Sequence, residues 1–255
     1  MKGDSPPDIR IDALRVCIGG RDVLCGIDLS LRKGEVMVVV GPSGSGKTTL
    51  LRAVNRLNES FPDCTTRGSV RMKLGDRIVD LYQDDLPLPE IRRRVGMVFQ
   101  TPAILPFSIE KNIRLPLRVA LGLKPQEIER RMEHALHDVG LWDEVKDRLN
   151  SPARMLSGGQ QQRLCLARTI ALDPEVLLLD EPTASLDFRA AARIEQWMVD
   201  HRDRYTILAV SHSLGQTRRI ADRVCVLKDG RIVETFGRDR MADVEDFYAR
   251  MEALF

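Results

Sequence analysis

The sequence feature that most constrains the fold is a glycine-rich segment at residues 41–48, which reads G-P-S-G-S-G-K-T. A continuous apolar run at residues 36–40 comes directly before it, as is typical of a strand buried on both faces of a parallel sheet. After it, Leu50, Leu51 and Val54 fall on one face of a helix. The segment therefore occupies a strand–loop–helix unit, the context in which the phosphate-binding loop G-x-x-x-x-G-K-[S/T] occurs.

The chemistry expected of this loop follows from its residue types. Glycines let backbone amides curl round a phosphate where a Cβ would obstruct the turn, and the helix that opens at Lys47 directs its positive end at the same anion. Lys47 is expected to reach the β- and γ-phosphates of ATP, and the Thr48 hydroxyl is expected to bind Mg²⁺. The predicted nucleotide-binding residues of this loop are Gly41, Pro42, Ser43, Gly44, Ser45, Gly46, Lys47, Thr48 and Thr49.

A second segment, residues 176–181, reads V-L-L-L-D-E and ends an apolar strand in two carboxylates. These carboxylates are expected at the C-terminal edge of the sheet, where ligands bind. Asp180 is predicted to hold Mg²⁺, and Glu181 is predicted to polarise the attacking water. Adjacent strand residues point to opposite faces, so both can serve one site only if the chain turns at the strand end. An acidic turn at residues 180–183 that binds no ligand is the alternative.

The charge balance bears on the class of partner. The chain has 255 residues, with 39 Lys and Arg against 37 Asp and Glu, a formal charge of +2. Nucleic-acid binding usually shows as clustered positive charge, so none is expected here. The arginines at residues 92–94 are the nearest approach to a cluster and are predicted to form a solvated face. The 5 cysteines include no Cys-x-x-Cys pair and are predicted to be free thiols without zinc.

The hydropathy of the sequence indicates the cellular compartment in which we expect the chain. No apolar run approaches the ~18 residues of a membrane span. The first residues of the chain lack the apolar stretch of a signal peptide. We therefore expect the chain to stay in the cytoplasm and to act at a membrane only by docking onto a partner.

The order of helix and strand patterns predicts the fold class. Alternating residues at 9–16 and 27–31 indicate strands, residues 126–139 have the pattern of an amphipathic helix, and α and β patterns alternate from residue 176 onward. We expect an α/β fold, a P-loop NTPase core with a mixed, largely parallel sheet, flanking helices and an N-terminal antiparallel β part. The core is predicted at residues 1–99 and 165–240, an inserted helical subdomain that bears the signature at 100–164, and a C-terminal tail at 241–255.

One further motif narrows the family. Residues 156–160 read L-S-G-G-Q, open a segment rich in Gln and Arg, and strongly resemble the signature of the ABC (ATP-binding cassette) family. A hydroxyl and glycine amides at a helix N-terminus make a second anion cradle. The resemblance implies that two chains dimerise head to tail, so that each ATP lies between the first loop of one chain and the signature of the other. The signature residues predicted to contact nucleotide are Ser157, Gly158, Gly159 and Gln160.

Other positions fit the same family pattern in order, so that the resemblance covers residues 9–236. Gln100 resembles the Q-loop glutamine, which implies contact with Mg²⁺ and the γ-phosphate, and residues 185–187 resemble the D-loop. His212 resembles the switch histidine, which implies contact with the γ-phosphate. The family commonly stacks an aromatic ring on adenine where this chain has Ile18. Aliphatic packing there would replace ring stacking and relax base selectivity. The predicted catalytic residues are Glu181, His212, Lys47 and Gln100, and the predicted metal ligands are Thr48, Gln100 and Asp180.

The resemblance also implies a function. It indicates an ATP-hydrolysing subunit of an ABC transporter, peripheral on the cytoplasmic face of the inner membrane, that pairs with a second ATPase subunit and with transmembrane permease subunits. An extracytoplasmic substrate-binding protein is implied as an indirect partner. Residues 54–58, 92–100 and 160–165 are most similar to bacterial phosphate-import ATPases, which implies phosphate import, although residues 102–107 and the tail differ.

Two other classes stay open from the sequence. One is a soluble ABC ATPase that acts on nucleic acid or ribosomes. The short spacing of Lys47 and Ser157 and the single cassette argue against it, because such relatives carry long coiled coils or two cassettes. The other is a regulatory module without turnover, which the presence of Glu181 and His212 argues against.

Overall fold

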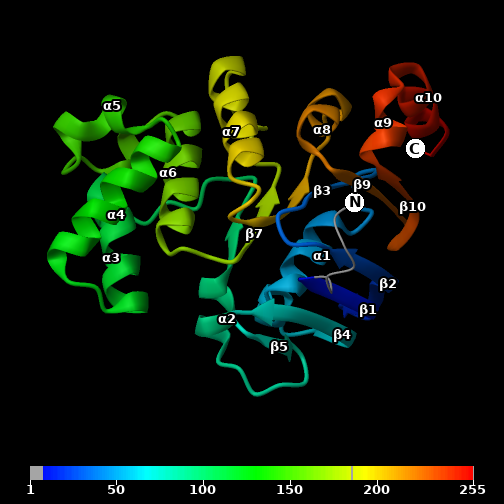
Figure 1. Ribbon diagram of the computed structural model, residues 1–255. Coiled ribbons are helices and arrows are strands. Elements are labelled where there is room, and N and C mark those ends of the chain that lie inside the picture. Colours follow the sequence, from blue (N-terminus) through cyan, green and yellow to red (C-terminus); the bar gives the residue numbers. More distant parts are fainter. Residues whose placement is uncertain (1–7, 185, 255) are drawn as a thin grey trace.

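The structure, a computed structural model, describes residues 8–184 and 186–254 (Figure 1). It contains two sheets. The smaller sheet is antiparallel, with strand order β2-β1-β4-β5, and the larger has the order β10-β9-β3-β8-β7-β6. The strands of the smaller sheet are β1 (Ile9–Ile18), β2 (Arg21–Leu31), β4 (Cys64–Leu74) and β5 (Arg77–Asp80).

The larger sheet is parallel from β6 to β9, and β10 adds one antiparallel edge. Every residue of β3, β7 and β8 is buried, as continuous apolar runs predict. The mixed, largely parallel sheet and the N-terminal antiparallel part are therefore confirmed. The strands are β3 (Val36–Val40), β6 (Val95–Val98), β7 (Val176–Asp180), β8 (Thr206–Val210), β9 (Arg223–Lys228) and β10 (Arg231–Gly237).

The helices form two groups. In Figure 1, α3 to α6 lie together as a green lobe to the left of the sheets, whereas the remaining helices lie on or beside the sheets. Among the described residues, no helix is both long and apolar enough to cross a membrane. The helices are α1 (Lys47–Val54), α2 (Leu88–Arg94), α3 (Ile109–Leu121), α4 (Pro125–Asp138), α5 (Trp142–Val145), α6 (Gly158–Ala171), α7 (Phe188–Asp200), α8 (Leu214–Ile220), α9 (Arg238–Ala242) and α10 (Val244–Leu254), with short 3₁₀ turns at Leu57–Ser60, Lys146–Arg148 and Ala153–Met155.

The larger sheet separates two hydrophobic cores. Met37 and Val39 of β3 face one core, which contains α1 and the antiparallel sheet. Val38 faces the other core, which contains residues of α7, α10 and the helical lobe. This alternation follows from the period of two along a strand. Because α1 packs between the two sheets, the loop that precedes it is fixed at the C-terminal end of β3.

The helix α6 connects the lobe to the sheet. It begins at the L-S-G-G-Q motif and packs against α3, α4 and β6. The predicted subdomain boundary between residues 164 and 165 falls inside this helix.

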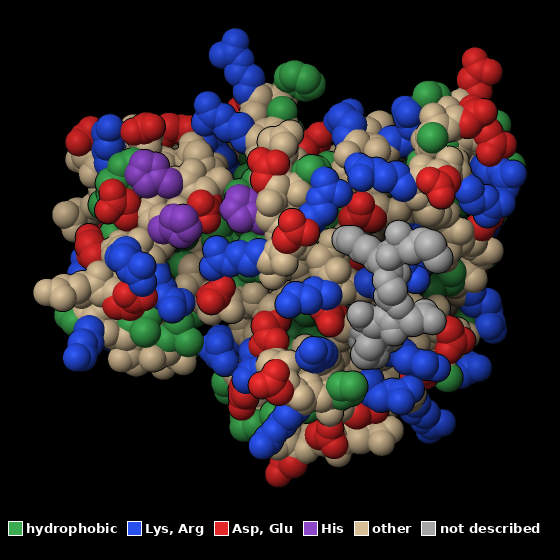
Figure 2. Space-filling view, viewed as in Figure 1, with side chains coloured by type: hydrophobic (Ala, Val, Ile, Leu, Met, Phe, Trp, Pro, Cys, Tyr) green, Lys and Arg blue, Asp and Glu red, His purple; other side chains and the backbone are tan. Residues whose placement is uncertain are grey.

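Charge on the surface is mixed. On the face viewed in Figure 2, Lys and Arg side chains are interspersed with Asp and Glu. The arginines at residues 92–94, predicted to form a solvated face, are only partly exposed, and two of them make hydrogen bonds within the chain. Arg92 Nη2 donates to the Arg56 carbonyl at 3.1 Å, and Arg94 Nη1 donates to Glu175 Oε1 at 2.9 Å.

Candidate nucleotide site

The loop between β3 and α1 packs closely against the rest of the chain at two of its glycines. A Cβ at Gly41 would lie 2.0 Å from the Leu227 carbonyl oxygen. Gly46 has φ +103°, and a Cβ there would lie 2.8 Å from Leu24 Cδ2. Both glycines are therefore required by this backbone, and α1 begins immediately after Gly46.

Lys47 lies folded over this loop. Its Nζ donates to the carbonyls of Gly41 at 2.8 Å and of Pro42 at 2.9 Å. Burial lowers the pKa of Lys47, and the carboxylates of Glu181 and Asp180 oppose that shift. Ser45 Oγ is buried and has no hydrogen-bond partner among the described residues. The loop thus holds a buried cation and an unpaired hydroxyl, which fits an anionic ligand.

Thr48 and Asp180 meet across the α1–β7 contact. Thr48 Oγ1 donates to Asp180 Oδ1 at 3.2 Å, and Asp180 is 4% exposed. Burial raises the pKa of Asp180, and the Thr48 hydrogen bond is the largest influence that lowers it. A hydroxyl and a carboxylate are the oxygen ligands that Mg²⁺ prefers, so this pair could hold the cation beside the loop.

Glu181 turns back to the same edge of the sheet as Asp180. Its φ is +49°, in the left-handed region, and its N–H donates to the Val210 carbonyl of β8 at 3.1 Å. The Glu181 carboxylate accepts from Gln100 Nε2 at 2.9 Å and lies 2.7 Å from His212 Nε2. The structure therefore brings together three predicted catalytic residues that lie far apart in the sequence.

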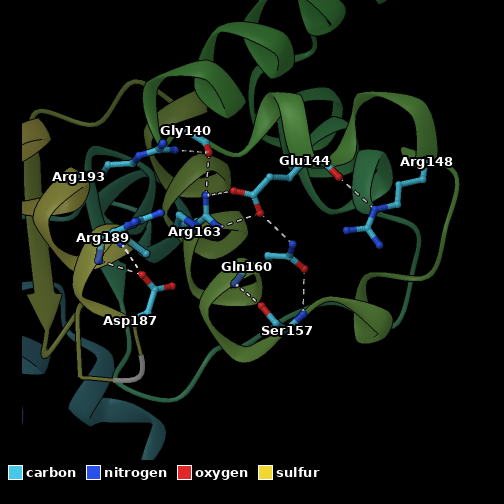
Figure 3. Close-up of polar contacts among 10 residues, drawn as sticks. Gly140, Glu144, Arg148, Ser157, Gln160, Arg163, Asp187, Arg189 and Arg193 are labelled. Carbon is cyan, nitrogen blue, oxygen red and sulfur yellow. Dashed lines mark hydrogen bonds and ion pairs between the residues drawn. The ribbon is translucent and has the colours of Figure 1, made fainter.

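The L-S-G-G-Q motif forms a capping box at the start of α6. Ser157 Oγ accepts from the Gln160 N–H at 3.3 Å, and the Ser157 N–H donates to Gln160 Oε1 at 3.0 Å (Figure 3). Ser157 and Gly158 are exposed. No hydrogen bond among the described residues joins residues 157–160 to residues 41–49, so the structure does not unite the two predicted cradles within one chain.

The comparisons with known proteins decide the family. A sequence profile described as ABC transporter matches residues 24–184. The chain belongs to the ABC transporter family. It is the ATP-binding, ATP-hydrolysing subunit of an ABC transporter.

Two curated relatives illustrate the similarity. Phosphate import ATP-binding protein PstB 2 of Aliivibrio fischeri is 42% identical over 231 residues, which are 91% of this chain and 84% of that protein. PstB of Thermotoga maritima is 42% identical over 89% of each chain. Among solved structures, the dimeric post-hydrolysis state of the ATP-binding cassette MJ0796 bound to ADP and Pi has a TM-score of 0.78 at 28% identity, covering 90% of this chain and 98% of that one.

Three other predicted positions of this ABC subunit have defined surroundings. Ile18 ends β1 and is partly buried against the core beside Cys64. Thr49 contributes its carbonyl to a hydrogen bond from Asn58 Nδ2 at 2.9 Å. Asp187 Oδ1 accepts from the N–H groups of Arg189 and Ala190, which caps α7. Ser185 of the predicted D-loop lies outside the described residues.

Sequence reasoning missed Gln216, a buried residue of α8. Its Oε1 accepts from Ser211 Oγ at 2.7 Å, and its Nε2 donates to Thr183 Oγ1 at 2.6 Å. It therefore ties the loop before His212 to the loop after Glu181. These residues line a pocket of about 250 Å³. The signal was weak, because a lone glutamine in an amphipathic helix is ordinarily solvent-exposed.

Proposed function

We propose that this chain hydrolyses MgATP as one of two identical subunits that enclose the nucleotide between them, and that the reaction powers phosphate import. The observation that carries the proposal is the position of Glu181. It lies between Gln100 and His212, at the sheet edge where Lys47, Thr48 and Asp180 also meet.

In this proposal, the phosphates of ATP lie in the loop of residues 41–48 and receive the Lys47 ammonium. Thr48 and Asp180 would hold Mg²⁺ and Gln100 would sense it; the ion would supply charge neutralisation at the phosphates. Glu181 orients water for in-line attack on the γ-phosphorus. His212 and Lys47 stabilise the charge on the transferring group, which is most of the catalysis in this class of reaction.

The second cradle is proposed to act on the partner's nucleotide. Ser157 Oγ accepts one hydrogen bond, which leaves its own proton free to donate to a phosphate. Gly158 has no positive φ, and a Cβ there would meet nothing within 4 Å. A glycine that its own chain does not require suits close approach by something outside the chain. The MJ0796 cassette, which is dimeric, supports this arrangement.

The transport part of the proposal is supported by the two relatives, which are phosphate import ATP-binding proteins. We propose that the chain lies peripherally on the cytoplasmic face of the inner membrane. It would contact permease subunits near residues 102–107, where Phe107 is 44% exposed. An extracytoplasmic substrate-binding protein would be an indirect partner. Purification from detergent extracts is expected to recover multi-span permease chains; recovery of ribosomes instead contradicts the transport role.

The hydrolytic role is tested by Glu181→Gln. Loss of general-base help is expected to lower turnover by about 10²- to 10⁴-fold while ATP binding persists. Steady-state phosphate release and equilibrium ATP binding measure the two effects separately. Glu133→Gln, at a 51% exposed carboxylate of α4, is the control and should leave both unchanged. Near-normal turnover of Glu181→Gln overturns the assignment.

A further inference from the structure

The carboxylate of Glu144 joins α5 to the start of α6 (Figure 3). Glu144 Oε2 accepts from Gln160 Nε2 at 2.8 Å and from Arg163 Nη2 at 3.0 Å. Its other oxygen accepts from Arg163 Nη1 at 2.8 Å. One carboxylate therefore receives three N–H groups from the first two turns of α6.

Arg163 anchors this contact in the protein. Its side chain is 7% exposed, and Nη1 also donates to the Gly140 carbonyl at 2.7 Å. Hydrogen bonding to Arg163 lowers the pKa of Glu144, so the carboxylate is ionised at neutral pH. A bidentate arginine pair fixes the direction of a carboxylate as well as its charge. Glu144 thus has one well-defined orientation toward Gln160.

Gln160 transmits that orientation to the motif. Its Oε1 accepts from the Ser157 N–H while its Nε2 donates to Glu144. Both ends of the amide are therefore occupied, which fixes the rotamer of the side chain and the direction of its oxygen. Without Glu144, the Nε2 group would have only water as acceptor, and the half of the capping box that holds the Ser157 backbone would loosen.

We propose that Glu144 is a positioning residue for the second anion cradle, residues 157–160, acting through Gln160 and Arg163. The inference rests on the proposed function, in which the cradle of one copy closes on the nucleotide of the other. Hydrogen-bond donors that are already held in place bind an anion more tightly than mobile donors, because they lose less conformational entropy on binding. Loss of Glu144 therefore weakens closure of the dimer without affecting the loop at residues 41–48 of the same chain.

The test uses the full chain carrying Glu181→Gln, in which ATP is bound but not consumed. Adding Glu144→Ala should raise the dissociation constant of the ATP-bound dimer by about 10-fold or more, the size of effect that follows when the hydrogen-bond partner of a metal ligand is removed. The ATP affinity of the monomer should change less than about twofold. Asp143→Ala is the matched control, because Asp143 neighbours Glu144 on α5 but is 82% exposed; it should leave dimerisation unchanged.

Glu144→Gln is the second variant, in case truncation impairs folding. Its remaining carbonyl oxygen can still accept from Gln160 Nε2 and Arg163 Nη2, as Glu144 Oε2 does, but the acceptor for Arg163 Nη1 and the negative charge are lost, so its dimer should be intermediate in strength. Unchanged dimerisation in both variants, or equal losses in monomer ATP binding and dimerisation, overturns the positioning role. Failure of the Glu181→Gln parent itself to dimerise with ATP refutes the proposed function, and this inference falls with it.

Discussion

At the scale of single residues, Glu181 makes the site possible through an unusual backbone conformation. A non-glycine residue with positive φ costs on the order of 1 kcal/mol or more. The cost is offset by the hydrogen bond of its N–H to Val210 and by the two contacts of its carboxylate. In return, the consecutive carboxylates Asp180 and Glu181 serve one edge of the sheet. The requirement for a turn was predictable from the sequence, but the left-handed conformation was not.

Binding of the adenine base also depends on a single residue, at position 18. Ile18 lies where the resemblance places an aromatic ring, and base–aromatic stacking is worth about 1–3 kcal/mol. Ile18→Tyr is therefore expected to tighten ATP binding by about tenfold, measured by titration calorimetry. Ile78→Tyr, at a 63% exposed position on β5, is the control. An unchanged dissociation constant in Ile18→Tyr discards this role for position 18.

At the scale of elements, buried strands and the loops that follow them were predictable, because continuous apolar runs have few alternatives. Several helices were not. The helix α3 contains Pro116, which disfavours a helix interior, and α2 begins at Leu88, directly after Pro87, in a short proline-rich segment. Glu144 lies on a short helix, and nothing local marks its pairing with Arg163, which is 19 residues away. Such pairs are set by tertiary packing rather than by local pattern.

The packing of the C-terminal tail was also not predictable from local sequence pattern, and it leads to a prediction about stability. Phe247 of α10 is fully buried and packs edge-on against Phe236 of β10, with ring centroids 6.2 Å apart. Phe247→Ala is expected to lower the free energy of unfolding by about 3–5 kcal/mol, because it leaves a cavity in the core. Denaturant titration measures the loss. Tyr248→Ala, at a 40% exposed neighbour, should cost far less; equal losses would mean that α10 does not pack as described.

At the scale of the whole molecule, the two anion cradles lie on different parts of the chain. One is clamped between the two sheets at the start of α1, and the other begins α6 on the helical lobe. The helix α6 extends from its exposed motif to a contact with β6. A displacement of the motif on ligand binding would therefore be transmitted to both the helical lobe and the larger sheet. The sequence could locate both cradles, and the family resemblance implied that they contact different nucleotides, but the structure was needed to show which helices and sheets hold each one.

The central claim is that one nucleotide is held by two copies of this chain, each giving a different cradle. Sedimentation velocity of Glu181→Gln measures this most directly. Without ATP the protein should sediment as a single chain of 28.8 kDa. With MgATP it should sediment as a species of about twice that mass, and removal of ATP should reverse the change. A strictly monomeric protein that is demonstrably saturated with ATP would contradict the account.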